Sequence, residues 1–139
     1  MVDKPAAGEV FRYPFLWKRQ QEQGETEGRK LRPVCMAVTT KTAKGHTLLF
    51  IVPLTTQPPF AGRVAIEVPV MEARRAGLDT DKPCWVMLDE FNTDVLERSY
   101  VFEDRMPLGS FSPKFTRHLQ AILREAASTG NAVVVKRQE

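Results

Sequence analysis

The sequence predicts a single α+β domain that is mainly β, in which several short strands precede one long C-terminal helix. Stretches rich in β-branched and aromatic residues alternate with Gly- and Pro-containing breaks as far as about residue 110. The apolar spacing then changes to a helical period over residues 115–126. A chain of 139 residues suits one hydrophobic core, so we expect one domain over residues 1–139 with its core at about 8–129. This order of elements fits either an open α+β fold or a small barrel with an appended helix.

The first three strands are expected near the N-terminus. Residues 8–17 are rich in aromatic and β-branched side chains and predict a strand. Residues 18–31 are almost wholly polar and cannot bury an apolar face, so we expect a long exposed loop there. Residues 33–40 and 47–53 predict two strands joined by a turn at 41–46, which makes a hairpin.

The middle of the chain contributes shorter elements. We expect a loop at residues 54–62, a strand at 63–68, a helical turn at 70–76 and a strand at 84–88. Residues 91–102 have no clear period, although a further strand near 99–102 fits the apolar side chains there.

The final element is a helix that begins near Ser112. Ser112 is a good N-cap, Pro113 suits the first helical position, and Gly130 ends the helix. Its apolar side chains recur at helical spacing and are Phe115, Leu119, Ile122, Leu123 and Ala126. The short apolar segment at residues 132–135 is expected either to add an edge strand or to pack against a partner.

Composition sets only broad limits on function. The chain has 20 Lys and Arg against 17 Asp and Glu, a net charge of +3 that permits a nucleic-acid partner without requiring one. Cys35 and Cys84 lie in apolar runs, so we expect buried free thiols rather than a disulfide. Two histidines and two distant cysteines offer no metal-ligand spacing, and we expect no metal or other cofactor. Without a signal-like segment or an apolar run of membrane length, we expect a cytoplasmic protein with no membrane partner.

Several segments, taken in order, resemble the MazF/PemK/Kid family of toxins from type II toxin–antitoxin systems. They are GEV at residues 8–10, EGRKLRPV at 27–34, VPLTTQ at 52–57, GL at 77–78, VMLDEFNT at 86–93 and the closing stretch at 109–123. The chain departs from the family pattern at Glu90, where Gln is common, and at Asn92, where Arg or Lys is common.

The resemblance implies a fold, an activity and partners. The fold is a small SH3-like antiparallel barrel of the MazF/CcdB kind with a C-terminal helix. The activity is that of a metal-independent, sequence-selective endoribonuclease on single-stranded RNA, which inhibits translation and growth. The partners are a second copy of the chain in a homodimer, a cognate antitoxin, and operator DNA in complex with that antitoxin.

The candidate catalytic residues are Arg32, Thr55 and Glu27. RNA can be cut without a metal because its own 2′-OH is the nucleophile, so the site needs a base, a fixed cation and a donor to the leaving oxygen. Arg32 suits the cation role because its forked donors match phosphate oxygens, and Pro33 favours an extended backbone at Arg32. Thr55 offers a hydroxyl at a strand end, and Glu27 is a candidate base. Structural alternatives are a surface ion pair for Arg32, a local turn bond for Thr55 and simple solvation for Glu27.

The candidate substrate-binding residues are Asp89, Thr56, Gln57, Arg29 and Lys30. The family position suggests Asp89, although a role in capping the following turn is equally open. Lys18, Arg19, Arg29 and Lys30 are expected to form a basic rim for a single strand. Nearby aromatic side chains either stack on that strand or belong to the core, and these are Phe11, Tyr13, Trp17, Phe60 and Phe91. Two other functions remain open: a non-catalytic binding protein such as a gyrase poison of the CcdB kind, and a DNA-binding regulator.

Overall fold

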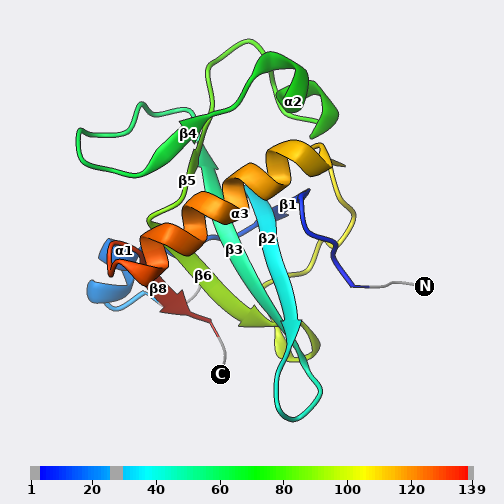
Figure 1. Cartoon of the computed structure of the whole chain (residues 1–139). Helices are drawn as coiled ribbons and strands as arrows, with labels where there is room; N and C mark the ends of the chain where they lie inside the picture. The colour runs from blue at the N-terminus through cyan, green and yellow to red at the C-terminus, as the bar shows by residue number, and fades with distance from the viewer. Residues whose placement is uncertain (1–3, 26–29, 138–139) are drawn as a thin grey trace.

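The computed structural model describes residues 4–25 and 30–137, and these form a mainly β chain with a long helix near the C-terminus (Figure 1). The elements in order are β1 (Glu9–Tyr13), α1 (Lys18–Glu22), β2 (Arg32–Lys41), β3 (Thr47–Thr55), β4 (Ala65–Glu67), α2 (Val70–Arg75), β5 (Trp85–Met87), β6 (Glu90–Val95), the 3-10 helix η1 (Leu96–Arg98), β7 (Gly109–Ser110), α3 (Pro113–Ser128) and β8 (Val133–Lys136). The predicted fold class, mixed and mainly β, is confirmed.

The sheet is built around β3, which pairs with β2 in an antiparallel hairpin as predicted. From β2 the sheet continues through β1 to β7, and from the other edge of β3 it continues through β5 to β4. β6 also pairs with β3, and β8 pairs with β6 in the parallel direction, whereas the other pairs are antiparallel. Within the described residues β4 and β7 are not paired with each other, so the sheet is open.

On the edge of β3 that faces away from β2, two separate strands, β5 and β6, pair with β3 one after the other. Leu54 lies opposite Val86, but Ile51, three residues earlier, lies opposite Asn92, six residues later. Three extra residues are therefore accommodated between the two strands, as in an extended bulge. The break divides the sheet, because β4 continues it beside β5 and β8 continues it beside β6.

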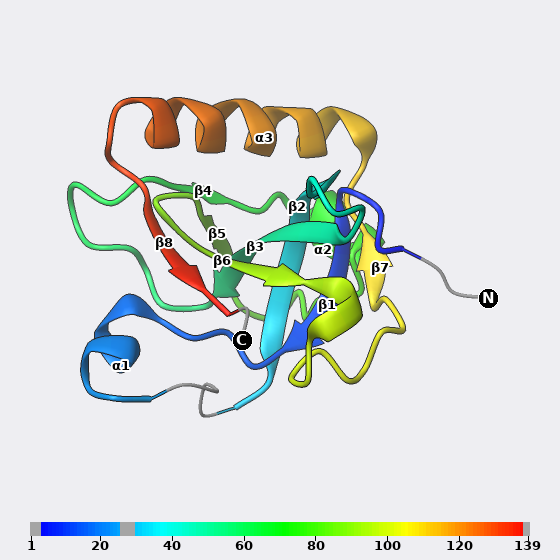
Figure 2. The ribbon, with the colours of Figure 1, turned by 90° about the horizontal axis from the view of Figure 1, so that it is seen from below.

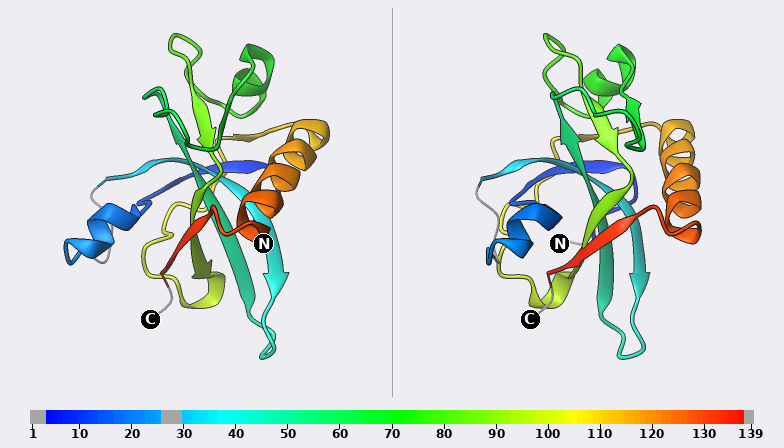
Figure 3. Two further views of the ribbon diagram at one scale, coloured as in Figure 1. Left: turned by 60° about the vertical axis from the view of Figure 1, so that its left-hand side comes forward. Right: turned by 90° about the vertical axis from the view of Figure 1, so that its left-hand side faces the viewer.

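The helix α3 lies across one face of the sheet, and α1 lies beyond the opposite side (Figures 2 and 3). The helix α3 begins where the sequence predicts, since the Ser112 hydroxyl accepts a hydrogen bond from the Phe115 N–H at 3.1 Å. Its buried face consists of Phe115, Thr116, Leu119, Leu123 and Ala126. None of the helices in the described part of the chain is long and apolar enough to cross a membrane.

A second core lies on the other side of the sheet, and it is dominated by aromatic residues. Phe11, Tyr13, Phe15 and Trp17 are all buried there with Phe102. The rings of Phe11 and Tyr13 each meet Phe102 edge-on, at centroid distances of 5.3 and 5.8 Å. The core alternative is therefore the correct one for Phe11 and Tyr13.

Two element predictions are wrong. Residues 18–22 form the helix α1 rather than a loop. Trp17 is the N-cap of this helix, and its backbone N–H donates to the Gln20 side-chain oxygen at 3.1 Å. No strand forms near residues 99–102, because the Ser99 hydroxyl accepts from the Phe102 N–H at 3.1 Å and holds a turn. The first strand also ends at Tyr13, before Pro14, which has no N–H to offer a neighbouring strand.

The C-terminal segment forms the edge strand β8. Val135 is fully buried, so it belongs to the core and is not available to a partner, whereas Val133 and Val134 are 40 % and 39 % exposed. The two cysteines are buried free thiols as predicted. Burial raises the pKa of Cys35 to about 12 and that of Cys84 to about 11, which makes both unreactive at neutral pH.

Candidate functional site

A groove of about 500 Å³ opens where the end of β3 meets the start of β2 and of α1. It is lined by Trp17, Arg19, Arg32, Thr55, Gln57, Pro58, Pro59, Phe60, Arg63 and Met87. Three of the predicted site residues, Arg32, Thr55 and Gln57, therefore lie together although they come from different segments. The groove also contains Arg19, which belongs to the predicted basic rim, and Arg63, which was not predicted.

Two guanidinium groups in the groove lie over one buried indole ring. The Cζ atoms of Arg19 and Arg32 are 5.3 and 5.4 Å from the ring centroid of Trp17, within range of a cation–π interaction. Neither arginine forms an ion pair within residues 4–25 and 30–137. Burial, and then the neighbouring charge of Arg19, lower the pKa of Arg32, but an arginine stays charged at neutral pH. The groove thus holds two close positive charges that an anion would neutralise.

Trp17 also presents an unsatisfied donor at this point. Its indole Nε1 is buried and has no hydrogen-bond acceptor among the residues that the structure describes. A buried N–H without a partner is costly, so Trp17 carries a local energetic penalty. The indole N–H is enclosed, so the ligand chemistry of the groove comes from the two guanidinium groups, which call for an anionic oxygen.

Trp17 is held in place by Asn92 of β6. The fully buried Asn92 side chain accepts from the Leu16 N–H at 3.0 Å and donates to the Leu16 carbonyl at 2.8 Å. Arg137 Nη1 donates to Asn92 Oδ1 at 3.1 Å and to the Pro14 carbonyl at 2.9 Å. Residues 14–17 are therefore fixed from both sides by side chains far away in the sequence. The sequence gives no sign of this role, and Asn92 was noted only as a departure from the family pattern.

Arg63 is positioned by Asp89, which lies at the break between β5 and β6. Arg63 Nε and Nη2 donate to the two Asp89 oxygens at 2.8 and 2.9 Å, and the Val64 N–H donates at 3.0 Å. Burial acts to raise the pKa of Asp89, but the bonds from Arg63 and Val64 outweigh it and the pKa is lowered. Asp89 does not line the groove, and it acts there through Arg63.

A buried carboxylate, Glu90, lies directly behind this cation. It accepts from the Lys18 N–H at 2.6 Å, and Arg63 Nη2 lies 3.5 Å from its other oxygen. Burial raises the pKa of Glu90, although the Lys18 hydrogen bond and the charge of Arg63 oppose the shift. Glu90 therefore ties the start of α1 to β6 and to Arg63. Four of the six β6 residues are polar or charged, so nothing in the local sequence distinguishes Glu90 as part of the site.

The remaining predicted residues are distributed as follows. The Thr55 hydroxyl accepts from the Gln57 N–H at 3.0 Å, a local turn bond that leaves its own proton free to donate. Thr56 and Lys30 are exposed and are not among the lining residues. Glu27 and Arg29 lie outside the described residues.

Phe60 and Phe91, which the sequence allows either to stack on a ligand or to pack in the core, lie in different environments. Phe91 is 8 % exposed and belongs to the core under α3, whereas Phe60 is 81 % exposed at the edge of the groove. Phe60 follows Pro58 and Pro59 in the loop after β3. The groove therefore combines arginine cations with an exposed aromatic ring, a combination typical of single-stranded nucleic-acid binding.

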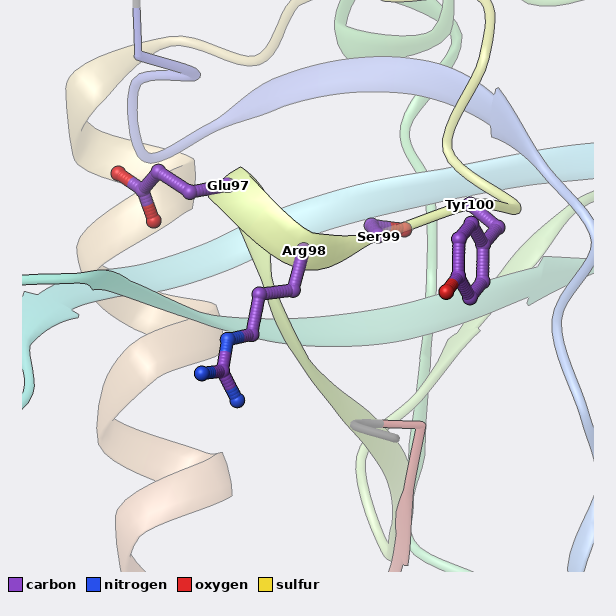
Figure 4. Close-up of a pocket in the computed structure, with 4 residues that line it drawn as sticks. All are labelled: Glu97, Arg98, Ser99 and Tyr100. Carbon is purple, nitrogen blue, oxygen red and sulfur yellow. The ribbon is translucent and has the colours of Figure 1, made fainter.

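Other parts of the surface offer less chemistry. A second hollow, of about 450 Å³, is lined by Glu97, Arg98, Ser99 and Tyr100, and Figure 4 shows these side chains spread along the segment rather than converging. The Glu97 carboxylate is already occupied by the N–H and hydroxyl of Thr47, both at 2.8 Å. In the described ranges no three His, Cys, Asp or Glu side chains gather as a metal site requires.

The groove at the end of β3 is thus the best-formed candidate site, and its chemistry is cationic, aromatic and hydroxylic. Its residues come from β2, β3, β5, α1 with the residue before it, and the loop after β3, so distant parts of the chain are needed to assemble it. No protein-family model matches this sequence, and no curated protein matches it either.

Proposed function

We propose that the chain is the toxin of a type II toxin–antitoxin system and acts as a metal-independent, sequence-selective endoribonuclease on single-stranded RNA. The observation that carries the proposal is the pair of guanidinium groups on Trp17, which form no ion pair with any residue of the described ranges 4–25 and 30–137, in one groove with the Thr55 hydroxyl. A phosphodiester supplies the missing negative charge, and its oxygens match the arginine donors.

In this proposal the groove acts on the phosphate and the RNA supplies the nucleophile. The 2′-OH attacks phosphorus, the bond to the 5′-oxygen breaks, and the products are a 2′,3′-cyclic phosphate and a free 5′-OH. Arg32 and Arg19 stabilise the charge that develops on the phosphate oxygens. Thr55 donates to a phosphate oxygen, and Glu27 is the proposed base that takes the 2′-OH proton. The 5′-oxygen takes up a proton as it leaves.

The finer fold and the assembly belong to the same proposal. We propose an SH3-like barrel of the MazF/CcdB kind as the finer fold, and the feature that supports it is the break between β5 and β6, which divides the sheet into two parts. The exposed Val133 and Val134 on the edge strand β8 favour a homodimer. The cationic groove would also suit an acidic segment of a cognate antitoxin, and operator DNA would be bound in complex with that antitoxin in the cytoplasm.

Incubation of the pure protein with single-stranded RNA in EDTA tests the activity. We expect cleavage that persists in EDTA and yields cyclic phosphate ends, and that is lost in Arg32→Ala. Arg98→Ala, which removes an exposed arginine of η1 outside the groove, is the matched control. Absence of cleavage for every RNA and every protein concentration would contradict the proposal. RNA binding without cleavage would indicate the non-catalytic alternative.

A further inference from the structure

Phe60 is the most exposed of the large apolar side chains that the structure describes, at 81 %. Single exposed apolar residues are common on protein surfaces and need no function. Phe60 differs from such a residue because it lines the same groove as Arg19, Arg32 and Arg63. Its ring makes none of the aromatic contacts found elsewhere in the described part of the chain.

The backbone around Phe60 is restrained on both sides. Pro58 and Pro59 fix φ at two consecutive positions immediately before it. After it, the Arg63 N–H donates to the Phe60 carbonyl at 3.1 Å across a tight turn, in which Gly62 has a φ of 88°. Arg63 is itself bound to Asp89, so the turn is anchored to the sheet. The backbone that carries the phenyl ring is thus fixed at the groove edge, and it has little conformational entropy left to lose on binding.

Trp17 is the other aromatic residue that lines the groove, but its ring is not open to a ligand. It is 8 % exposed, Phe15 meets it edge-on at 5.0 Å, and both guanidinium groups lie over it. A base entering the groove therefore cannot stack on Trp17 without displacing an arginine. Phe60 is the aromatic surface that remains.

We propose that Phe60 is the stacking platform for one unpaired base of the RNA, adjacent to the phosphate held by Arg19 and Arg32. This inference rests on the proposed function. A single strand presents phosphates and bases alternately, and the groove offers cations and an exposed ring side by side. Stacking itself tolerates any base, whereas the Gln57 amide, exposed in the same groove, offers both a donor and an acceptor to the edge of that base. The subsite therefore selects an unpaired nucleotide, and Gln57 contributes to which base is preferred.

Binding of a short 2′-O-methyl RNA tests the subsite, because this RNA lacks the nucleophile and stays intact. We expect Phe60→Ala to weaken binding by roughly five- to hundredfold, the range of one lost base–aromatic stack. Phe60→Trp keeps an aromatic surface and should bind as the wild type does. Tyr100→Ala is the matched control, because Tyr100 is 72 % exposed but lies in the hollow beside η1. Thermal melts of each variant report on folding, which an exposed side chain should leave unchanged.

A scan with single abasic positions along the same RNA supplies the second readout. Removal of one particular base should weaken RNA binding by the wild type about tenfold. Removal of the same base should not weaken RNA binding by Phe60→Ala any further. If the wild type binds no RNA at all, the proposed function fails. The subsite is overturned, while the proposed function stands, if the wild type and Phe60→Ala bind intact RNA equally well. The same conclusion follows if each abasic position weakens binding by the two proteins to the same extent. Tight RNA binding by Phe60→Ala together with loss of self-association would assign Phe60 to a protein interface instead.

Discussion

At the scale of single residues, the groove depends on guanidinium groups that are already in place. Arg32 is held against Trp17 before any ligand arrives, so little reorganisation is needed when charge develops on a phosphate. Arg63 is held more tightly, by two bonds to Asp89, and part of its charge is neutralised there. Arg19 and Arg32 are therefore the cations most available to a ligand.

Arg32→Ala is expected to abolish most cleavage. Removing one preorganised charged donor costs about 3 kcal/mol in the transition state, roughly a hundredfold in rate. Arg32→Lys should rescue the rate only in part, because an ammonium group cannot reproduce the guanidinium fork. Single-turnover cleavage is measured beside a thermal melt for each variant. An Arg32→Ala protein that cleaves like the wild type would show that the site has been assigned wrongly, and one that does not fold would show that Arg32 is structural.

Two neighbouring threonines provide a matched comparison at the end of β3. Thr55 lines the groove and Thr56 does not, although both are adjacent in the chain. Thr55→Val keeps the shape and removes the hydroxyl, so it should slow single-turnover cleavage more than Thr56→Val does. Equal rates for the two variants would remove the Thr55 hydroxyl from the mechanism.

Sequence motifs predicted the residues of the groove that lie at strand ends, Arg32, Thr55 and Gln57. They did not indicate Arg63, Glu90 or Asn92 as parts of the site. Those residues act through partners far along the chain, such as Asn92 with Leu16, which is 76 positions away. No local pattern encodes such a pairing, because it depends on how the strands are arranged in space.

At the scale of elements, β6 organises the site without lining it. All six of its residues are buried, including polar Asn92, Thr93 and Asp94. Tyr13 donates to Asp94 at 2.7 Å, and Asn92 bonds Leu16, so β6 fixes both the end of β1 and the segment after it. A buried strand with this many polar groups is stable only while all of its bonds are made.

Asn92→Ala is therefore expected to destabilise the protein strongly. It leaves the Leu16 N–H and carbonyl without their partner, at a cost of about 2–4 kcal/mol for two buried groups. Asn131→Ala is the control, because Asn131 is exposed and its side chain bonds, within the described part of the chain, only the nearby Thr129 hydroxyl at 3.0 Å. Urea denaturation gives the free energy of unfolding for both variants. A loss no larger for Asn92→Ala than for Asn131→Ala would contradict the positioning role of Asn92.

Element prediction succeeded where one local signal was strong and failed where tertiary contacts decided the outcome. The helix α3 followed from Ser112, Pro113 and the apolar spacing. The five-residue helix α1 has no buried side chain and therefore no apolar period to detect. Residues 99–102 resembled a strand because Tyr100, Val101 and Phe102 are apolar, but the Ser99 hydroxyl holds them in a turn.

At the scale of the whole molecule, the fold class was predictable from the sequence and the pairing of the strands was not. Periodicity identified most of the strands, but it cannot show that the three extra residues between β5 and β6 divide the sheet in two. It also cannot show that β8 pairs in the parallel direction with β6 rather than beside a sequence neighbour. These features are set by packing between distant segments.

The response of the whole fold to acid is expected to depend on Glu97. Bonds from the Thr47 backbone and, more weakly, its hydroxyl lower the pKa of Glu97 from 4.5 to about 2. A lowered folded-state pKa contributes stability above the unfolded pKa, and this contribution is lost as the pH falls from 4.5 towards 2. Glu97→Gln should therefore melt at a lower temperature than the wild type at pH 7, and the two curves should converge near pH 2. A difference in melting temperature that is the same at every pH would contradict this assignment.

The bonds from Arg137 to Asn92 and Pro14 also have a consequence for biosynthesis. A ribosome makes the groove residues first, but the segment that carries Trp17 gains its last two side-chain bonds only after Arg137 has left the exit tunnel. Until then β6 lacks its neighbour β8, and the tryptophan beneath the two arginines lacks part of its support. An unfinished chain therefore carries the arginines without the geometry that makes them effective. The groove is therefore fully supported only once β8 has been made.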